Sequence, residues 1–476
     1  VIGVPSDVIT LDPARYPPHW VTDVVQRNVY DTLVRRGPGG EFVPGLARAW
    51  ERLTPTLWRF RLARGARFHD GSPLSADDVA ASLRRALPGG LGPDALPLSQ
   101  RIEPIAAVRA VDEQTLEIEL KRPWPHLLAA LTHVGVVPAP MASGPIEAAV
   151  GSGPYTVEAW VHGNRVVLAR AEPIEAGTDD GAAQGTVQRV VFEVIPDAEA
   201  RFAALRDGRV DIAARLSPDM AHRLRAADGL RAVRAPGRVV YFISFDLRHP
   251  PFNDVRVRRA IAHGIDFAAV REAVNGGLGI SAALPMVPAA VGASLGIPPP
   301  KYDPAQARRL LAEAGYPRGF LFELDTTPDR EAFARAYAEA LADIGLGVTV
   351  RVWPDRRSLE RAVRGGGRTA WLDGWEFEYL DPWEAFAARF VSGGGEAWRG
   401  YFNPRFERLV HQARTAPDPA SQGALLREAA KLWFTDLPAV VEFVSEELYG
   451  VRRGVVGLSP APDGSLALVE LRLEDG

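Results

Sequence analysis

The residues from Ala370 to Phe386 combine aromatic and acidic side chains at a density that packing alone does not require. Three tryptophans, one tyrosine and two phenylalanines occur there with five acids. Aromatic faces offer apolar area and attract cations, while carboxylates accept hydrogen bonds from amines. The stretch therefore predicts a wall that holds a polar, partly cationic ligand. A solvated acidic face with tryptophans in the core has the same composition and is the alternative at this point.

Other patterns that could carry chemistry lack the context they need. The sequence Gly292-Ala-Ser-Leu-Gly296 matches the G-x-S-x-G pattern of a nucleophile elbow, but prolines flank it where a strand and a helix are required. No Lys directly follows a Gly, as a Walker loop demands. The nine His have no metal-binding spacing. We therefore expect no catalytic residue, no metal and no cofactor.

Composition restricts the class of protein. A chain of 476 residues exceeds one hydrophobic core, so two or three domains are expected. The net charge of −4 and the lack of a basic block argue against nucleic acid as a partner. The absence of Cys excludes disulfides and thiolate sites. No apolar run reaches the ~18 residues of a membrane span. The first residue is Val, so we expect that a signal or lipid-anchor segment precedes it.

The surrounding chain has the periodicity of an α/β protein. Asp303 and Pro304 are typical of a helix start, and Gly315 of its end. Ser75 and Asp78 form a capping-box pattern. Expected strands lie at 1–8, 57–62, 115–120, 189–195, 239–245, 320–324, 347–353 and 440–444. Expected helices lie at 22–33, from 75 onward, 198–207, 254–274 with a break near Gly264, 303–315, 329–344, 358–364 and 421–434.

An ordered series of motifs, spread over nearly the whole chain, resembles one protein family. The motifs are Leu11–Pro13, Tyr30–Leu33, Val43–Ala47, Trp58–Leu62 with Phe68–Gly71 and Ser75–Val79, Gly151–Tyr155, Pro251–Arg258 with Gly264–Asp266, Tyr302–Pro317 and Tyr401–Pro404. Together they are similar to the extracytoplasmic solute-binding proteins of ABC importers, family 5, which serve dipeptides, oligopeptides and nickel complexes.

The resemblance implies a two-lobed α/β fold of the periplasmic-binding-protein type. This fold is class II-like, has an extra subdomain in its first lobe and has two hinge crossovers, which fall here near 239–246 and 440–448. The expected division is 1–43 and 152–240 in lobe I, 44–151 as its extra subdomain, 241–444 as lobe II, and 445–476 as a return segment of lobe I.

The resemblance also implies a ligand site. Peptide-binding members carry G-W-x-x-D-Y-x-D-P, whose first Asp pairs with the ligand's ammonium group. Residues Gly374 to Pro382 fit this pattern with Glu378 in place of that Asp. Glu376 is expected to face away, and Asp381 to shape the turn. Dipeptide binders place an Arg for the ligand carboxylate near position 328, and Arg330 is the nearest Arg here. The remaining expected ligand contacts are Trp375, Tyr379, Tyr241, Phe245, Trp20, His19 and Trp383.

The implied function is capture of a peptide or similar amine-bearing solute in the interlobe cleft by hinge closure, followed by delivery to a membrane permease. The implied protein is monomeric, is not an enzyme, and works outside the cytoplasm, in the periplasm or at a cell surface, with a lipid anchor as one expectation. An oligosaccharide or opine-type ligand in the same fold is the first alternative. A hydrolase that uses Glu376 and Glu378 is the alternative from another class.

Overall fold

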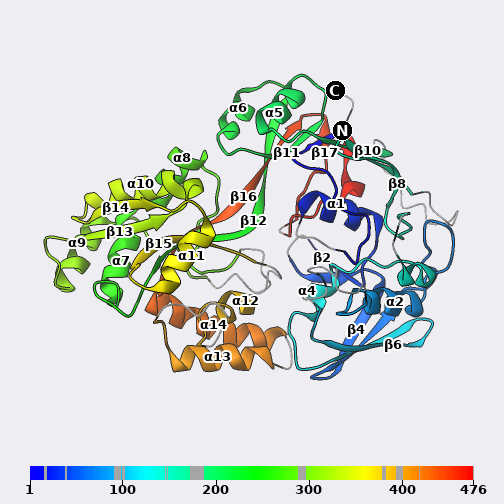
Figure 1. The fold of residues 1–476 in the computed structure, drawn as a ribbon, viewed down its shortest axis with the longest axis horizontal. Coiled ribbons are helices and arrows are strands. Elements are labelled where there is room, and N and C mark those ends of the chain that lie inside the picture. The colour runs from blue at the N-terminus through cyan, green and yellow to red at the C-terminus, as the bar shows by residue number, and fades with distance from the viewer. Residues whose placement is uncertain are drawn as a thin grey trace. The chain divides into compact units, whose positions relative to one another are not determined.

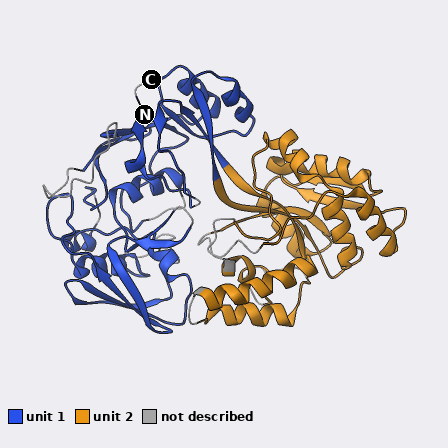
Figure 2. Cartoon of the chain, turned by 180° about the vertical axis from the view of Figure 1, so that it is seen from behind, with its two compact units in different colours: residues 1–235, 447–476 blue, residues 236–446 orange. Residues whose placement is uncertain are grey.

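The chain folds into two compact units in the computed structural model. The structure describes residues 1–15, 19–37, 40–90, 98, 102–144, 146, 148–171, 187–287, 296–377, 382–392, 400–416, 419–461 and 463–474. Unit 1 comprises 1–235 and 447–476, and unit 2 comprises 236–446 (Figure 2). The sequence-based limits of the second lobe were 241 and 444. The limits of the extra subdomain, 44 and 151, stay a prediction.

Two long strands carry the chain from one unit into the other and back. β12 (Leu230–Phe245) leaves unit 1, and β16 (Ala439–Arg452) returns to it (Figure 1). Both are rich in valine, with aromatic residues among them, which favours extended backbone. The predicted crossover at 440–448 lies inside β16, and the one at 239–246 lies on β12 up to its last residue, Phe245. A fold with two crossovers is therefore confirmed. The strands are longer than their apolar runs indicated.

Unit 1 contains a mixed sheet and a separate antiparallel sheet. The first has the strand order β16-β11-β1-β10-β9-β8, and the second β4-β5-β7-β6. The strands are β1 (Ile2–Val4), β2 (Val34–Arg36), β3 (Phe42–Pro44), β4 (Ala47–Thr54), β5 (Leu57–Leu62), β6 (Ile105–Asp112), β7 (Thr115–Leu120), β8 (Tyr155–Val161), β9 (Arg165–Arg170), β10 (Arg189–Val194), β11 (Ile212–Leu216), β17 (Val455–Val456) and β18 (Arg472–Leu473). The helices are α1 (Trp20–Val29), α2 (Ala76–Ala86), α4 (Leu127–Leu131), η2 (Ala139–Ser143), α5 (Ala198–Arg206), α6 (Met220–Ala226) and η4 (Leu468–Glu470).

Local sequence signals explain where the helices of unit 1 begin. The backbone N–H of Ser75 donates to Asp78 at 2.8 Å, and the Ser75 hydroxyl donates to the same carboxylate at 2.9 Å. This capping box starts α2, as the sequence predicted. The first strand is shorter than expected, because the chain bends after Val4 and Val8 turns into the core.

Unit 2 is built on the strand order β14-β13-β15-β12-β16. β13 pairs in parallel with β14 and β15, while β12 and β15 are antiparallel. Its own strands are β13 (Leu321–Thr326), β14 (Gly347–Val352) and β15 (Ala370–Glu376). Its helices are α7 (Val255–Gly264), α8 (Phe267–Asn275), α9 (Pro304–Glu313), η3 (Pro328–Arg330), α10 (Glu331–Ala342), α11 (Arg356–Gly365), α12 (Pro382–Ala387), α13 (Pro404–Arg414) and α14 (Pro419–Asp436).

Two apolar clusters hold unit 2 together. One joins β12, β13 and β15 to α7, α9 and α10, and includes Phe245, Ile261, Leu311 and Tyr337. The other joins the strands to α12, α13 and α14 around the fully buried Trp433. Together they fix the register of β12 against β15, which aligns Tyr241 with Gly374. The strand ends that line the site are therefore held by a packed core.

Candidate functional site

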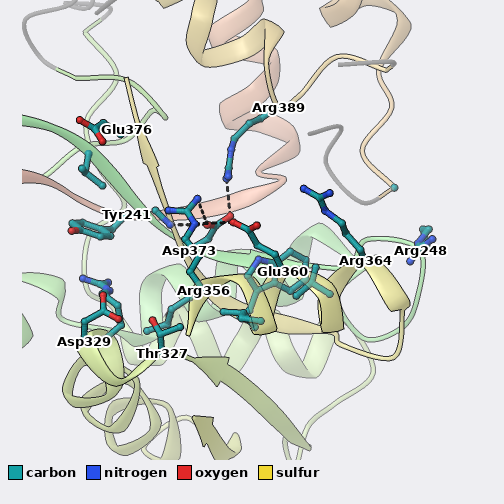
Figure 3. Close-up of a pocket in the computed structure, with 18 residues that line it drawn as sticks. Tyr241, Arg248, Thr327, Asp329, Arg356, Glu360, Arg364, Asp373, Glu376 and Arg389 are labelled. Atoms are coloured by element: carbon teal, nitrogen blue, oxygen red, sulfur yellow. Dashed lines mark hydrogen bonds and ion pairs between the residues drawn. The ribbon is translucent and has the colours of Figure 1, made fainter. Parts of the chain in front are cut away.

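Unit 2 contains a cavity of about 750 Å³, large enough for a small peptide. Its lining comes from β12, β15, the turn after β13 and one face of α11 (Figure 3). The lining combines apolar side chains with charges of both signs. The lining residues are Val239, Tyr241, Arg248, Thr327, Asp329, Arg330, Arg356, Leu359, Glu360, Val363, Arg364, Trp371, Leu372, Asp373, Gly374, Glu376, Arg389 and Gly400.

The aromatic part of the wall depends on one glycine. A Cβ built on Gly374 would lie 3.1 Å from both Cδ1 and Cε1 of Tyr241, which is tighter than ordinary contact. The ring of Tyr241 therefore lies over the Gly374 backbone, and a larger residue at position 374 would displace it. This explains the Gly in the Gly-Trp pair without appeal to backbone flexibility.

The Asp373 carboxylate lies between two arginines of the cavity, Arg389 and Arg356. Arg389 donates to its Oδ2 at 2.7 Å, and the guanidinium of Arg356 lies 3.9 Å from its Oδ1 (Figure 3). Arg356 also pairs with Glu360 at 2.8 Å. Burial alone would raise the pKa of Asp373, but the two arginines outweigh it and hold that pKa below its ordinary value. Asp373 is thus an ionised anchor whose charge is already matched.

A buried ion pair supports the same wall from behind. Arg330 donates to Glu442 on β16, and the Tyr337 hydroxyl donates to the same carboxylate oxygen at 2.5 Å. The Arg330 guanidinium also lies 4.1 Å from the ring centroid of Tyr241 and 4.3 Å from that of Phe333. Such cation–π contacts strengthen when water is excluded. Arg330 therefore fixes the position of the Tyr241 ring.

The protonation of this buried pair follows from its surroundings. Burial raises the pKa of Glu442, and the charge of Arg330 opposes that shift. Burial would lower the pKa of Arg330, but Glu442 and Tyr337 outweigh it, so the pKa of Arg330 is raised. Arg330 remains a cation whose charge Glu442 neutralises.

Arg330 was predicted to bind the ligand's carboxylate. It does line the cavity, but only 7% of the residue is exposed and it has an internal acid as partner. In the sequence, Glu442 is the one acid within the apolar run 440–444, and this pattern indicates a buried ion pair. The ligand role predicted for Arg330 remains untested, and the structure supplies a different role for its charge.

The other predicted contacts in unit 2 have distinct positions. Trp375 is partly buried, with the Arg389 guanidinium 4.7 Å from its ring centroid. Its indole N–H is buried and has no hydrogen-bond partner among the described residues. The Trp383 indole donates to the Val410 carbonyl at 2.9 Å. Phe245 is fully buried and stacks on Phe252, with ring centroids 4.9 Å apart. Phe245 thus belongs to the core, because its side chain points into the cluster under the sheet.

Two predicted contacts belong to unit 1. The Trp20 indole donates to the Gly464 carbonyl at 2.8 Å. His19 is the N-cap of α1 and bonds the hydroxyls of Ser6 and Thr22, each at 2.9 Å. Burial and the nearby Arg215 lower the pKa of His19. Both side chains therefore have structural partners inside unit 1.

The predicted ammonium partner, Glu378, and its neighbours Tyr379 and Asp381 lie outside the described residues, as does Ser294 of the G-x-S-x-G pattern. Glu376 was expected to face away from the ligand. It instead lines the cavity (Figure 3). Its exposed carboxylate accepts a hydrogen bond from Arg238 at 2.7 Å. Positions 374 and 376 are two apart on β15, so they face the same side of the sheet, and both line the cavity.

Sequence reasoning missed four residues that shape this cavity: Asp373, Arg389, Arg364 and Glu442. Asp373 and Arg389 are sixteen positions apart, and no local pattern joins them. Arg364 had a detectable signal, because α11 repeats apolar residues at 359 and 363 beside it.

In the described part of the chain, no group of acidic, His or Cys side chains is arranged to hold a metal ion. No helix found there is long and apolar enough to cross a membrane.

Comparison with known proteins identifies the family. Residues 41–397 match the model of the bacterial extracellular solute-binding proteins, family 5. The chain belongs to this family. The sequence-based family assignment is therefore confirmed, and so is the two-lobed α/β fold class.

Curated relatives and solved structures agree with this assignment. A dipeptide-binding protein of Escherichia coli is 26% identical, over 92% of this chain and 87% of its own. A periplasmic oligopeptide-binding protein of the same species is also 26% identical, over 89% and 83%. The structure of a periplasmic murein tripeptide-binding protein in its unliganded open form has a TM-score of 0.86 at 22% identity, covering 99% of this chain and 96% of its own. That structural likeness supports the fold.

Proposed function

We propose that this family 5 protein binds a peptide or a similar small amine-bearing solute and delivers it to the membrane permease of an ABC importer. It binds its ligand without chemical turnover and works as a monomer outside the cytoplasm. Attachment to a membrane through a lipid is part of the same proposal. Peptides are favoured over the sugar or opine alternative, because the two curated relatives are named as dipeptide- and oligopeptide-binding proteins.

The cavity of unit 2 is the observation that carries this proposal. It offers an aromatic ring over a glycine, apolar side chains on α11, and charges of both signs. A peptide has the matching chemistry, since it carries an amine, an acid and apolar side chains. Edges of β-strands can also bind an extended peptide through its backbone, which tolerates varied side chains.

Glu378 is the proposed partner of the ligand's amine. It occupies the acid position of the family pattern and carries the same charge as Asp on a longer side chain. A carboxylate accepts charge-assisted hydrogen bonds from an ammonium group, which are stronger than neutral ones. Tyr241, Trp375 and Tyr379 are proposed to pack the ligand beside it.

Native mass spectrometry of the purified protein tests the ligand class, because a captured peptide would appear as a defined mass shift. Isothermal titration calorimetry then tests Glu378 directly. We expect Glu378→Gln to weaken binding of a peptide with a free N-terminus by about 1.5–3 kcal/mol.

The matched control is the same peptide with an acetylated N-terminus, which has no ammonium group to lose. The wild-type protein should bind the acetylated peptide more weakly than the free peptide. Wild type and Glu378→Gln should bind the acetylated peptide with nearly equal affinity. Unchanged affinity of Glu378→Gln for the free peptide would reject the role of Glu378. A wild-type protein that binds no peptide would reject peptide capture itself.

A further inference from the structure

Within the part of unit 2 that the structure describes, one arginine of the cavity has no partner. Arg248 pairs with Asp246 at 2.5 Å, Arg330 with Glu442, Arg356 with Glu360, and Arg389 with Asp373. Among the described lining residues, the remaining arginine, Arg364, makes no ion pair and no hydrogen bond. Of the described arginines that line this cavity, Arg364 is thus the one whose charge a ligand can neutralise without breaking an existing pair.

The position of Arg364 on its helix places it in the cavity lining. The lining residues of α11 are 356, 359, 360, 363 and 364, which recur with the spacing of one helix face. Leu359 and Val363 are buried on this face and hold the helix against the wall. The α11 helix therefore presents the Arg364 guanidinium beside an apolar strip.

The free acid of the cavity lies elsewhere. Asp329, in the short helix after β13, lines the same cavity and has no ion pair or hydrogen bond within the described chain. In Figure 3, Asp329 and Arg364 lie on opposite sides of the pocket. An acidic group placed near Asp329 would be repelled, so the two charges orient an anionic ligand group toward Arg364.

We propose that Arg364 binds an acidic group of the ligand, and that this site selects peptides carrying a carboxylate at the α11 end of the cavity. The carboxylate is either the peptide C-terminus or an acidic side chain, since a guanidinium binds both in the same forked manner. This inference rests on the proposed peptide capture. It transfers to Arg364 the ligand role expected for Arg330, whose charge is already neutralised inside the protein.

Calorimetry with three synthetic peptides tests the site. Ala-Ala-Ala carries a C-terminal carboxylate, its C-terminal amide carries none, and Ala-Glu-Ala amide carries only a side-chain carboxylate. We expect the wild-type protein to bind at least one carboxylate peptide about tenfold or more tightly than the amide without a carboxylate. Arg364→Gln should abolish that difference. Arg364→Lys should keep part of it, because it retains the charge but loses the fork.

Arg357→Gln is the matched control. Arg357 is an exposed residue of the same helix and is not among the residues that line the cavity. Its replacement by Gln removes the same charge as Arg364→Gln. It should keep the wild-type preference for a carboxylate. An equal preference in Arg364→Gln and wild type would overturn the Arg364 site while leaving peptide capture intact. Failure of the wild-type protein to bind any of the three peptides would overturn both proposals.

Discussion

Arg330 illustrates the limit of reading a residue from its neighbours in sequence. The family resemblance alone implied a ligand carboxylate as its partner, because Arg330 is the Arg nearest to the family's carboxylate-binding position after β13. Its actual partner, Glu442, is 112 residues further along the chain, on β16. Tertiary packing brings the two charges together. The lone acid in the apolar run 440–444 indicates a buried pair, but no local pattern identifies Arg330 as its partner. Arg364 is the opposite case: sequence analysis passed over it, and no described residue of the cavity forms an ion pair with it.

Removal of the Glu442 charge should destabilise unit 2. Glu442→Gln keeps the size of the side chain but leaves the buried Arg330 cation without a counter-charge. Breaking a buried pair on one side costs about 3–5 kcal/mol. Urea unfolding of wild type and variant should show a loss of this size in the free energy of unfolding.

Two further variants separate the lost pair from other effects of mutation. Glu428→Gln alters an exposed glutamate whose partner is Lys431, and it should change stability by under about 1 kcal/mol. The double variant Arg330→Met with Glu442→Leu removes both charges, so it should be less destabilised than Glu442→Gln alone. Equal unfolding free energies for Glu442→Gln and wild type would show that the pair does not support the fold.

At the scale of elements, α11 links the sequence to the site most directly. Asp355 caps its start by accepting a hydrogen bond from the Ser358 N–H at 2.8 Å. Its end is set by Gly366, whose φ of 86° and ψ of 172° are accessible essentially to glycine only. The cap and the glycine together determine which turn of the helix carries Arg364.

A substitution at Gly366 should therefore cost stability through the backbone alone. Nothing lies within 4 Å of a Cβ added there, so no steric clash contributes. We expect Gly366→Ala to lower the free energy of unfolding by about 1–3 kcal/mol. Gly365→Ala is the matched control, because Gly365 is the last helical residue and also has open space around it. It should be neutral or stabilise by up to about 1 kcal/mol, and the same loss at both positions would refute the backbone explanation.

Elements with strong local signals were predictable from sequence, while the cavity was not. The capping box at Ser75 and the Asp303-Pro304 start of α9 appear where the sequence put them. The aromatic and acidic stretch from 370 is a strand up to Glu376 and a helix from Pro382. Composition predicted a ligand wall there, and that role stays a prediction. The partners of Asp373 and Glu376 come from the turn after α12, from α11 and from β12. Only the assembled sheet brings them together.

At the scale of the molecule, β12 and β16 are continuous strands that belong partly to each unit. The family resemblance predicts that ligand binding favours a more compact arrangement, to the extent that the ligand binds that arrangement better. We expect small-angle X-ray scattering to show a lower radius of gyration when a cognate peptide is added. A peptide that lacks affinity by calorimetry serves as the control. Saturating binding without compaction would contradict hinge closure.

The chain order of unit 2 has a consequence for how such proteins diversify. Unit 2 is one uninterrupted segment, and its two ends lie side by side: the Ser445 hydroxyl accepts a hydrogen bond from the Val239 N–H at 3.1 Å, and a Cβ on Gly237 would collide with the same hydroxyl. A segment whose ends are adjacent can be exchanged between related genes at two neighbouring junctions without threading through the rest of the chain. The cavity residues all lie inside that segment. Recombination within β12 and β16 would thus exchange all the residues that line this cavity together, in one continuous segment.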